Sequence, residues 1–168
     1  SLETRLNEGI ALKRRIIENL RPSALEQLGL VSALEILCQD MSGVLNTPVH
    51  ADLQPVQVGK NAELTLYRIA QEALTNVGKY ACCQRINLQL RQIGQTVHLR
   101  VQDDGKGFHP EQIPHGSHGL VGMRVRVESH GGQLNVVSAP ARGTTIEAAL
   151  PVQHTGPSQA DPPVPRPV

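Results

Sequence analysis

Residues 85–102 read RINLQLRQIGQTVHLRVQ, and residues 103–118 read DDGKGFHPEQIPHGSH. Apolar and polar side chains alternate over residues 85–91 and again over 96–102, with Gly94-Gln95 between the two stretches. Alternation of this kind on both sides of a two-residue glycine turn predicts a β-hairpin. The glycine- and proline-rich residues that follow predict a long loop at the end of the second strand.

The flanking sequence places this hairpin in a larger sheet. Residues 47–53 alternate weakly and predict a strand, and residues 61–80 predict a helix whose buried stripe has helical spacing (Leu66, Ala70, Ala73, Leu74 and Val77). Residues 119–130 predict a further helix, and residues 133–138 and 144–150 predict a second hairpin. A doubly wound parallel sheet would alternate strand and helix throughout, whereas hairpins require antiparallel pairs. We therefore expect an α+β fold: a two-layer sandwich of a mixed, largely antiparallel sheet with helices on one face.

The two ends of the chain differ from this central part. Residues 2–20 predict an amphipathic helix that ends before Pro22, since a residue preceding proline avoids the helical region. Ser23 and Glu26 match a capping box for a short helical turn, and residues 31–42 predict another helix that Gly43 ends. Residues 152–168 are proline-rich and poor in apolar side chains, which predicts a disordered tail, with a proline-rich ligand for a partner domain as the alternative. The predicted divisions are residues 1–22, 23–151 and 152–168.

Composition excludes several classes of function. The formal net charge is +1 and aromatic residues make up 2% of the chain, so neither an attractive field nor a stacking platform for nucleic acid is expected. No apolar run approaches the length of a membrane span, and no signal peptide is visible, so we expect no membrane contact and a cytoplasmic location. The three cysteines lack the spacing of a zinc site or a disulfide framework and are expected to be reduced.

The helix over residues 61–80 carries the first candidate site. Glu72, Asn76 and Lys79 lie at i, i+4 and i+7 and share one face. A solvated surface is the simple explanation, but the adjacent stretch TNVG is a poor helix former, and such departures concentrate where function requires them. A carboxylate and an amide oxygen one turn apart suit a hard cation such as Mg²⁺, which takes few protein oxygens.

Three other segments are weak signals when taken singly. Asp103 ends a strand, where its carboxylate can accept a hydrogen bond from an exocyclic amine. The glycines at alternate positions after it let the backbone turn sharply and approach a ligand closely. A plain turn is equally consistent with this segment. The segment 116–123 is a glycine-rich loop that enters a helix and can bind an anion, although it is neither a Walker loop nor a dinucleotide fingerprint. Residues 143–145, GTT, can be a hairpin turn and nothing more.

In this order, the segments QEALTNVGKYA, DDGKGF, GSHGLVGMR and GTT resemble the motifs of the histidine-kinase ATPase domain, a group that includes the ATPase domains of DNA gyrase and MutL. RIAQEALTN, HGLVGMRVRVESHGG and LRPSALEQLGLVSALE resemble more specifically the nitrate-sensor type of bacterial histidine kinase. The resemblance covers about residues 1–151. It implies ATP and Mg²⁺ as cofactors, a response regulator as partner, and a homodimeric parent protein anchored in the bacterial inner membrane.

The resemblance also implies a role for individual residues. Asn76 would hold magnesium, with Glu72 beside the metal and the reacting phosphate, and Lys79 and Tyr80 would lie near the phosphates; histidine is frequent in the family at position 80. Asp103 would recognise the adenine amino group. The other implied nucleotide contacts are Gly105, Gly107, Gly119, Leu120, Gly122 and Thr144, and residues 109–118 would form a mobile lid over the ATP.

The acceptor histidine of this family is followed by an acidic residue, and none of the 7 histidines here is. Residues 1–22 therefore resemble the end of the dimerisation region, with the acceptor helix missing, and the chain is expected to bind ATP without labelling itself. His109, His115 and His118 are expected to be solvated loop residues, since no carboxylate or cysteine cluster completes a metal shell. A gyrase-like ATPase using Glu72 and a non-catalytic nucleotide- or partner-binding module remain as alternatives.

Overall fold

The central hairpin predicted from residues 85–102 is present. The computed structural model describes residue 5 and residues 22–80, 82–112 and 118–152. Strand β2 (Ile86–Ile93) pairs antiparallel with β3 (Thr96–Asp103), and Ile93 lies opposite Thr96 across the turn. Gly94 in that turn has φ 59°, a left-handed conformation that glycine adopts at little cost. The expectations for residues 2–20 and for the tail beyond residue 152 lie outside the described residues.

The hairpin forms the middle of a five-stranded mixed sheet with the order β1-β2-β3-β5-β4. Strand β1 (Val49–Leu53) runs parallel to β2, whereas β5 (Thr144–Pro151) pairs antiparallel with both β3 and β4 (Gln133–Ser138). The predicted mixed, largely antiparallel sheet is confirmed.

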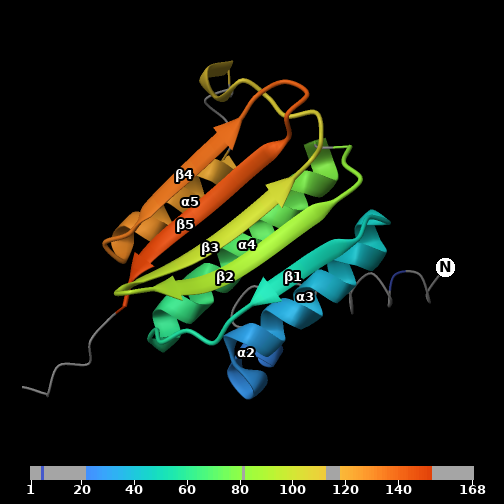
Figure 1. Ribbon diagram of the computed structural model, residues 1–168. Helices are drawn as coiled ribbons and strands as arrows, with labels where there is room; N and C mark the ends of the chain where they lie inside the picture. Colours follow the sequence, from blue (N-terminus) through green and yellow to red (C-terminus); the bar gives the residue numbers. More distant parts are fainter. Residues whose placement is uncertain (1–4, 6–21, 81, 113–117, 153–168) are drawn as a thin grey trace, which may run out of the picture.

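The α-helices of the described residues are α2 (Ser23–Leu28), α3 (Leu30–Leu45), α4 (Lys60–Tyr80) and α5 (His118–Ser129). In the view of Figure 1, α4 and α5 lie behind the sheet and α3 lies beside the edge strand β1, so the fold has two layers, as predicted. Buried leucine, isoleucine and valine side chains alternate along β2, β3 and β5 and meet the apolar stripe of α4. Among the described residues, no helix combines the length and the apolar character needed to cross a membrane.

Two predicted details near the N-terminal side were wrong. Helix α3 does not end at Gly43 but continues to Leu45, and Asn46 caps it in a left-handed conformation with φ 49°. Leu45 packs against the core, which outweighs the cost of about 1 kcal/mol for one helical glycine. Ser23 is the first residue of α2 rather than its cap, and no side-chain hydrogen bond caps this helix.

One row of paired residues crosses the whole sheet and defines the end where the candidate site lies. It runs from Val49 on β1 through Ile86, Asp103 and Thr144 to Ser138 on β4. Helix α4 and strand β3 both end at this side of the sheet, and the connection that leads from β3 towards α5 starts there (Figure 1). That connection contains a short 3₁₀ turn, Pro110–Gln112.

Candidate functional site

The face of α4 predicted to bind a cation is only partly exposed. Glu72 and Asn76 are half-buried and one helical turn apart, whereas Lys79 is exposed. Thr75, one of the poor helix formers in this stretch, donates its hydroxyl to the Gln71 carbonyl at 2.8 Å, so its polar group is satisfied within the helix. Tyr80 is the last residue of α4, and its side chain lies outside the described part of the structure.

The start of α5 is packed against this same face of α4. A Cβ added at Gly119 would lie 2.5 Å from Glu72 Oε1 and 3.6 Å from Asn76 Nδ2. Only glycine allows this approach without displacing the carboxylate, so Gly119 brings the first turn of α5, with its free N–H groups, close to Glu72 and Asn76. Gly122, one turn further along, has no atom of the other described elements within 4 Å of an added Cβ, and half-buried Leu120 packs against the core.

Asp103 contributes a buried carboxylate at the end of β3. It is 6% exposed and continues the inward-facing series Val97, Leu99 and Val101, so its side chain points to the side of the sheet that the helices cover. The Gly105 N–H donates to Asp103 Oδ1 at 2.9 Å, and the Thr144 N–H donates to the same carboxylate. Burial raises the pKa of Asp103, and these two hydrogen bonds oppose that increase. Asp103 and Asn76 are therefore on the same side of the fold, as the sequence-based prediction requires.

The neighbouring Asp104 has a different role. It is exposed, and its Oδ1 accepts hydrogen bonds from the backbone N–H groups of Gln84 and Arg85, both at 2.9 Å. These bonds, with the Arg85 N–H as the largest contribution, lower the pKa of Asp104. Asp104 thus fixes the entry into β2, while Asp103 is left to face the interior of the site.

The loop after Asp103 is held in place by the turn between β4 and β5. Gly107 has φ 60°, and a Cβ there would lie 2.0 Å from the Ala139 carbonyl oxygen. The Ala141 N–H donates to the Lys106 carbonyl at 2.7 Å. Gly143 has φ 71°, and a Cβ there would lie 2.0 Å from the Asp103 carbonyl oxygen. Both glycines are therefore required for two backbone segments to touch.

Ser138 is a residue of this site that the sequence reasoning missed. Its buried hydroxyl lies 2.9 Å from the Phe108 nitrogen, 3.1 Å from the Gly143 carbonyl oxygen and 2.8 Å from Thr144 Oγ1. The burial pattern of β4 turns Leu134, Val136 and Ser138 inward. A serine at an inward position next to the GTT turn was the available signal.

Metal-binding alternatives find no support in the described residues. They contain no group of three or more histidine, cysteine, aspartate or glutamate side chains that could hold a metal ion. The three cysteines are free in this structure, and burial raises the pKa of Cys38 to about 11. An amide and a carboxylate fit Mg²⁺, which keeps several waters and binds substrate phosphates, rather than a metal that needs a closed protein shell. His109 is exposed, as expected, while residues 113–117 of the predicted lid lie outside the described ranges.

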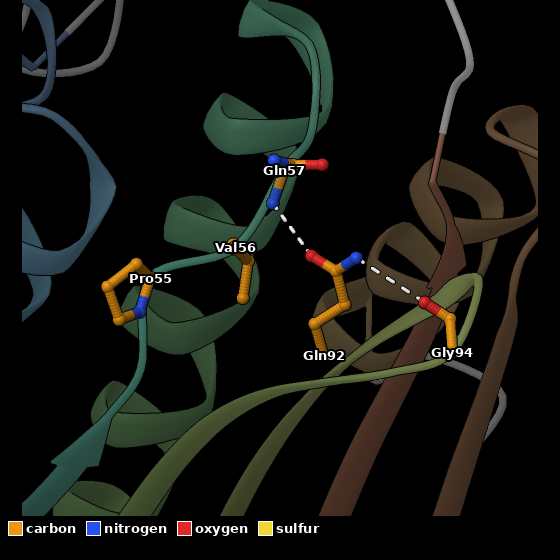
Figure 2. Close-up of a pocket in the computed structure, with 5 residues that line it drawn as sticks. All are labelled: Pro55, Val56, Gln57, Gln92 and Gly94. Atoms are coloured by element: carbon orange, nitrogen blue, oxygen red, sulfur yellow. Dashed lines mark hydrogen bonds between the residues drawn. The ribbon is translucent and has the colours of Figure 1, made fainter.

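A separate hollow lies at the opposite end of β2 and β3. It has a volume of about 470 Å³ and is lined by Pro55, Val56, Gln57, Gln92 and Gly94 (Figure 2). The Gln57 N–H donates to Gln92 Oε1 at 2.9 Å, and Gln92 Nε2 donates to the Gly94 carbonyl at 3.4 Å. These bonds fasten the segment after β1 to the hairpin turn, and none of the five lining residues is ionisable. The hollow is open and lacks the chemistry found at the other end of the sheet.

Residues 61–154 match the family model described as histidine kinase-, DNA gyrase B- and HSP90-like ATPase. The chain belongs to this family. The matched segment contains α4 except its first residue, Asp103 and the glycine-rich connection to α5, so the family match covers the candidate site described above. Sequence relatives include the sensor histidine kinase LiaS of Bacillus subtilis, 33% identical over 139 residues, which covers 83% of this chain and 39% of LiaS. The histidine-protein kinase/phosphatase DegS of Brevibacillus brevis is 32% identical over 155 residues, covering 90% of this chain and 40% of DegS.

Solved structures show the same fold. A histidine kinase domain from the blue-light activated kinase EL346 of Erythrobacter litoralis superposes with a TM-score of 0.65 over 73% of this chain and 61% of that one, at 21% identity. The mycobacterial sensor histidine kinase MprB gives a TM-score of 0.55 at 26% identity, covering 71% of this chain and 89% of that one. The ATPase domain described here is thus homologous to the ATP-binding domain of sensor histidine kinases. The chain spans about two fifths of the length of LiaS and DegS.

Proposed function

We propose that this ATPase domain binds Mg-ATP and transfers the γ-phosphoryl group to a histidine on a dimerisation domain, for relay to a response regulator. The observation that carries the proposal is how closely α5 approaches α4 at Gly119, where an added Cβ would lie 2.5 Å from Glu72 Oε1 and 3.6 Å from Asn76 Nδ2. It brings the start of a helix, a carboxylate and an amide together on the side of the sheet that Asp103 faces. A helix start favours phosphate, and an inward-facing carboxylate favours an amino group, so one ligand with both groups fits the arrangement.

Different residues would bind the base and the phosphates of the nucleotide. Asp103 would accept a hydrogen bond from the adenine amino group, with Gly105, Gly107 and Thr144 shaping the base pocket. Asn76 would hold Mg²⁺, and the metal would neutralise phosphate charge. Glu72 would lie beside the metal and the reacting phosphate.

Backbone N–H groups near Gly119, Leu120 and Gly122 would bind phosphate oxygens, and Lys79 and Tyr80 would lie near the same phosphates. In transfer, an imidazole nitrogen of the acceptor histidine bonds to the γ-phosphorus as the bond to the ADP oxygen breaks. Positioning and charge neutralisation supply most of the catalysis in such reactions.

The acceptor histidine and its neighbouring acid would come from outside this chain, because none of its histidines is followed by an acidic residue. The partners we propose are therefore the dimerisation domain of the same protein, as a homodimer, and a response regulator. A cytoplasmic location is part of this proposal, since ATP and response regulators are found there.

The test is a nucleotide titration with and without Mg²⁺, followed by phosphotransfer to separately produced acceptor helices. We expect Mg²⁺-dependent ATP binding, no labelling of the chain itself, and labelling of the acceptor helices. Asn76→Ala should lose the Mg²⁺ dependence. Efficient self-labelling on a histidine of this chain would contradict the proposal, and rapid ATP hydrolysis without transfer would favour a gyrase-like ATPase instead. An Asn76→Ala protein that binds Mg-ATP as well as the parent would favour the non-catalytic module.

A further inference from the structure

The hydroxyl of Ser138 lies at the centre of a small network beside the proposed base pocket. It accepts the Phe108 N–H at 2.9 Å, and both the Gly143 carbonyl oxygen and Thr144 Oγ1 are within hydrogen-bond distance, at 3.1 and 2.8 Å. Ser138 is 9% exposed, so water does not readily replace these partners. Its three neighbours belong to three parts of the site: the loop after β3, the turn before β5, and the first residue of β5.

The count of protons in this network fixes its direction. A serine hydroxyl has one proton and two acceptor sites, and a carbonyl oxygen only accepts. If the Ser138 proton went to Thr144, the Gly143 carbonyl would lose its hydroxyl donor. The contacts of Ser138 with the Gly143 carbonyl and with Thr144 are both hydrogen bonds only when Ser138 donates its proton to Gly143 and the Thr144 hydroxyl donates its proton to Ser138.

This direction determines what Thr144 presents to a ligand. With its proton committed to Ser138, Thr144 Oγ1 has only lone pairs left, and the residue is half-buried rather than sealed. Thr144 pairs with Asp103 across the sheet, and the alternation along β5 turns Thr144 inward, to the side that Asp103 faces. The pocket then offers two neighbouring acceptors, the Asp103 carboxylate and Thr144 Oγ1, and the Thr144 hydroxyl does not compete as a donor.

We infer that Ser138 is a positioning residue for base recognition: it orients the Thr144 hydroxyl as an acceptor, so that the pocket selects a 6-aminopurine over a 6-oxopurine. This inference rests on the proposed nucleotide site and adds the origin of its base selectivity. A 6-amino group donates to acceptors, whereas a 6-oxo group is itself an acceptor and would face two lone-pair-bearing groups. A site with buried polar groups discriminates strongly against a ligand that leaves them unpaired.

The experiment compares binding of ATP with that of inosine triphosphate, which carries a 6-oxo group. In Ser138→Ala the Thr144 hydroxyl is free to rotate and donate, so we expect the preference for ATP to fall by roughly 3- to 10-fold, the size of one such hydrogen bond. Ser42→Ala is the matched control. Ser42 also donates to a carbonyl, of Cys38 at 2.8 Å, and accepts a backbone N–H, from Val49 at 2.9 Å. Val49 is on β1, at the opposite edge of the sheet from β4. We expect Ser42→Ala to lose stability without changing the ATP preference.

A double-mutant cycle with Thr144→Val separates this role from a general loosening of the loop. If Ser138 acts through the Thr144 hydroxyl, Ser138→Ala has no further effect on the preference once that hydroxyl is absent. Equal effects of Ser138→Ala in both backgrounds, or an unchanged preference in the single variant, would overturn the inference. If the parent protein bound ATP and inosine triphosphate equally, the inference about base selectivity would be overturned, and the proposed phosphate-binding site would still stand. A parent that binds neither would instead refute the proposed function.

Discussion

Substituting Gly119 by alanine tests whether the position of Glu72 matters for phosphotransfer. The added Cβ would lie 2.5 Å from Glu72 Oε1, whereas ordinary contacts of a Cβ begin at 3.4 Å, so the carboxylate oxygen must move by roughly 0.9 Å. The contacting atom is the end of a flexible side chain, and alanine favours the helix over glycine by up to about 1 kcal/mol. We therefore expect a folded protein with little change in its unfolding free energy.

The reaction should respond much more strongly than the fold. A misplacement of about 1 Å in a catalytic group can cost on the order of 100-fold in rate, so we expect Gly119→Ala to slow transfer by about 10- to 100-fold. The assay is single-turnover transfer of labelled phosphate to separately produced acceptor helices, with thermal unfolding and ATP titration on the same samples.

Gly43→Ala on α3 is the control, since a Cβ there meets no atom of another element in the described part of the chain within 4 Å, and the site lies in another helix. It should raise stability by up to about 1 kcal/mol and leave the transfer rate unchanged. A Gly119→Ala protein that transfers phosphate at the parental rate would refute the reasoning, because the displaced carboxylate would then have no part in the reaction.

Three further changes test other parts of the site. A Cβ at Gly122 meets no atom of the other described elements within 4 Å, so Gly122→Ala should leave thermal unfolding unchanged or slightly improved; a fall in ATP affinity would place phosphate at this glycine, and an unchanged affinity would exclude it. Asp103→Asn should weaken adenine nucleotides selectively. In the parent, ATP affinity should fall on acidification with a midpoint above pH 3.8, because burial raises the pKa of Asp103, and this pH dependence should be absent in the variant. Asp104→Asn should lower the unfolding free energy by at most about 1 kcal/mol at pH 7, and the difference should shrink below about pH 4, because the depressed pKa of Asp104 stabilises the fold only while the carboxylate is ionised.

The central strands of the sheet were predictable because buried and more exposed side chains alternate along β2, β3 and β5. In β3, Val97, Leu99 and Val101 fix which face is buried, and the same alternation carries forward to Asp103. Side chains along a strand point alternately to its two faces, so the direction of the Asp103 side chain could be predicted from the sequence. The end of α3 could not be predicted in this way. A glycine such as Gly43 commonly ends a helix, whereas the packing of Leu45 depends on α4, where its side chain lies against Gly78.

The contacts between segments were beyond the sequence for a similar reason. Gly119 and Glu72 are 47 positions apart, and their approach depends on how α5 packs against α4, which no local pattern contains. The sequence signal at Gly119 was a glycine-rich helix entry, and the structure adds that the glycine is required by a specific carboxylate. The two adjacent aspartates are a second case: Asp103 is buried, whereas Asp104 is exposed and accepts hydrogen bonds from the Gln84 and Arg85 N–H groups, partners that no local pattern identifies.

The difference between these aspartates explains why Asp103 is the better ligand-binding group. A carboxylate has about four lone-pair sites, and the N–H groups of Gly105 and Thr144 occupy two at Asp103. Water would complete the shell of an exposed carboxylate such as Asp104, so a ligand would gain little by replacing it there. At Asp103 burial removes most of that water and raises the pKa, so an incoming amino group supplies hydrogen bonds that the free protein lacks. The selectivity of the site for an amino group is therefore expected to depend on how well the surrounding loop keeps water out, and changes that expose Asp103 should weaken ATP binding even when the carboxylate itself is retained.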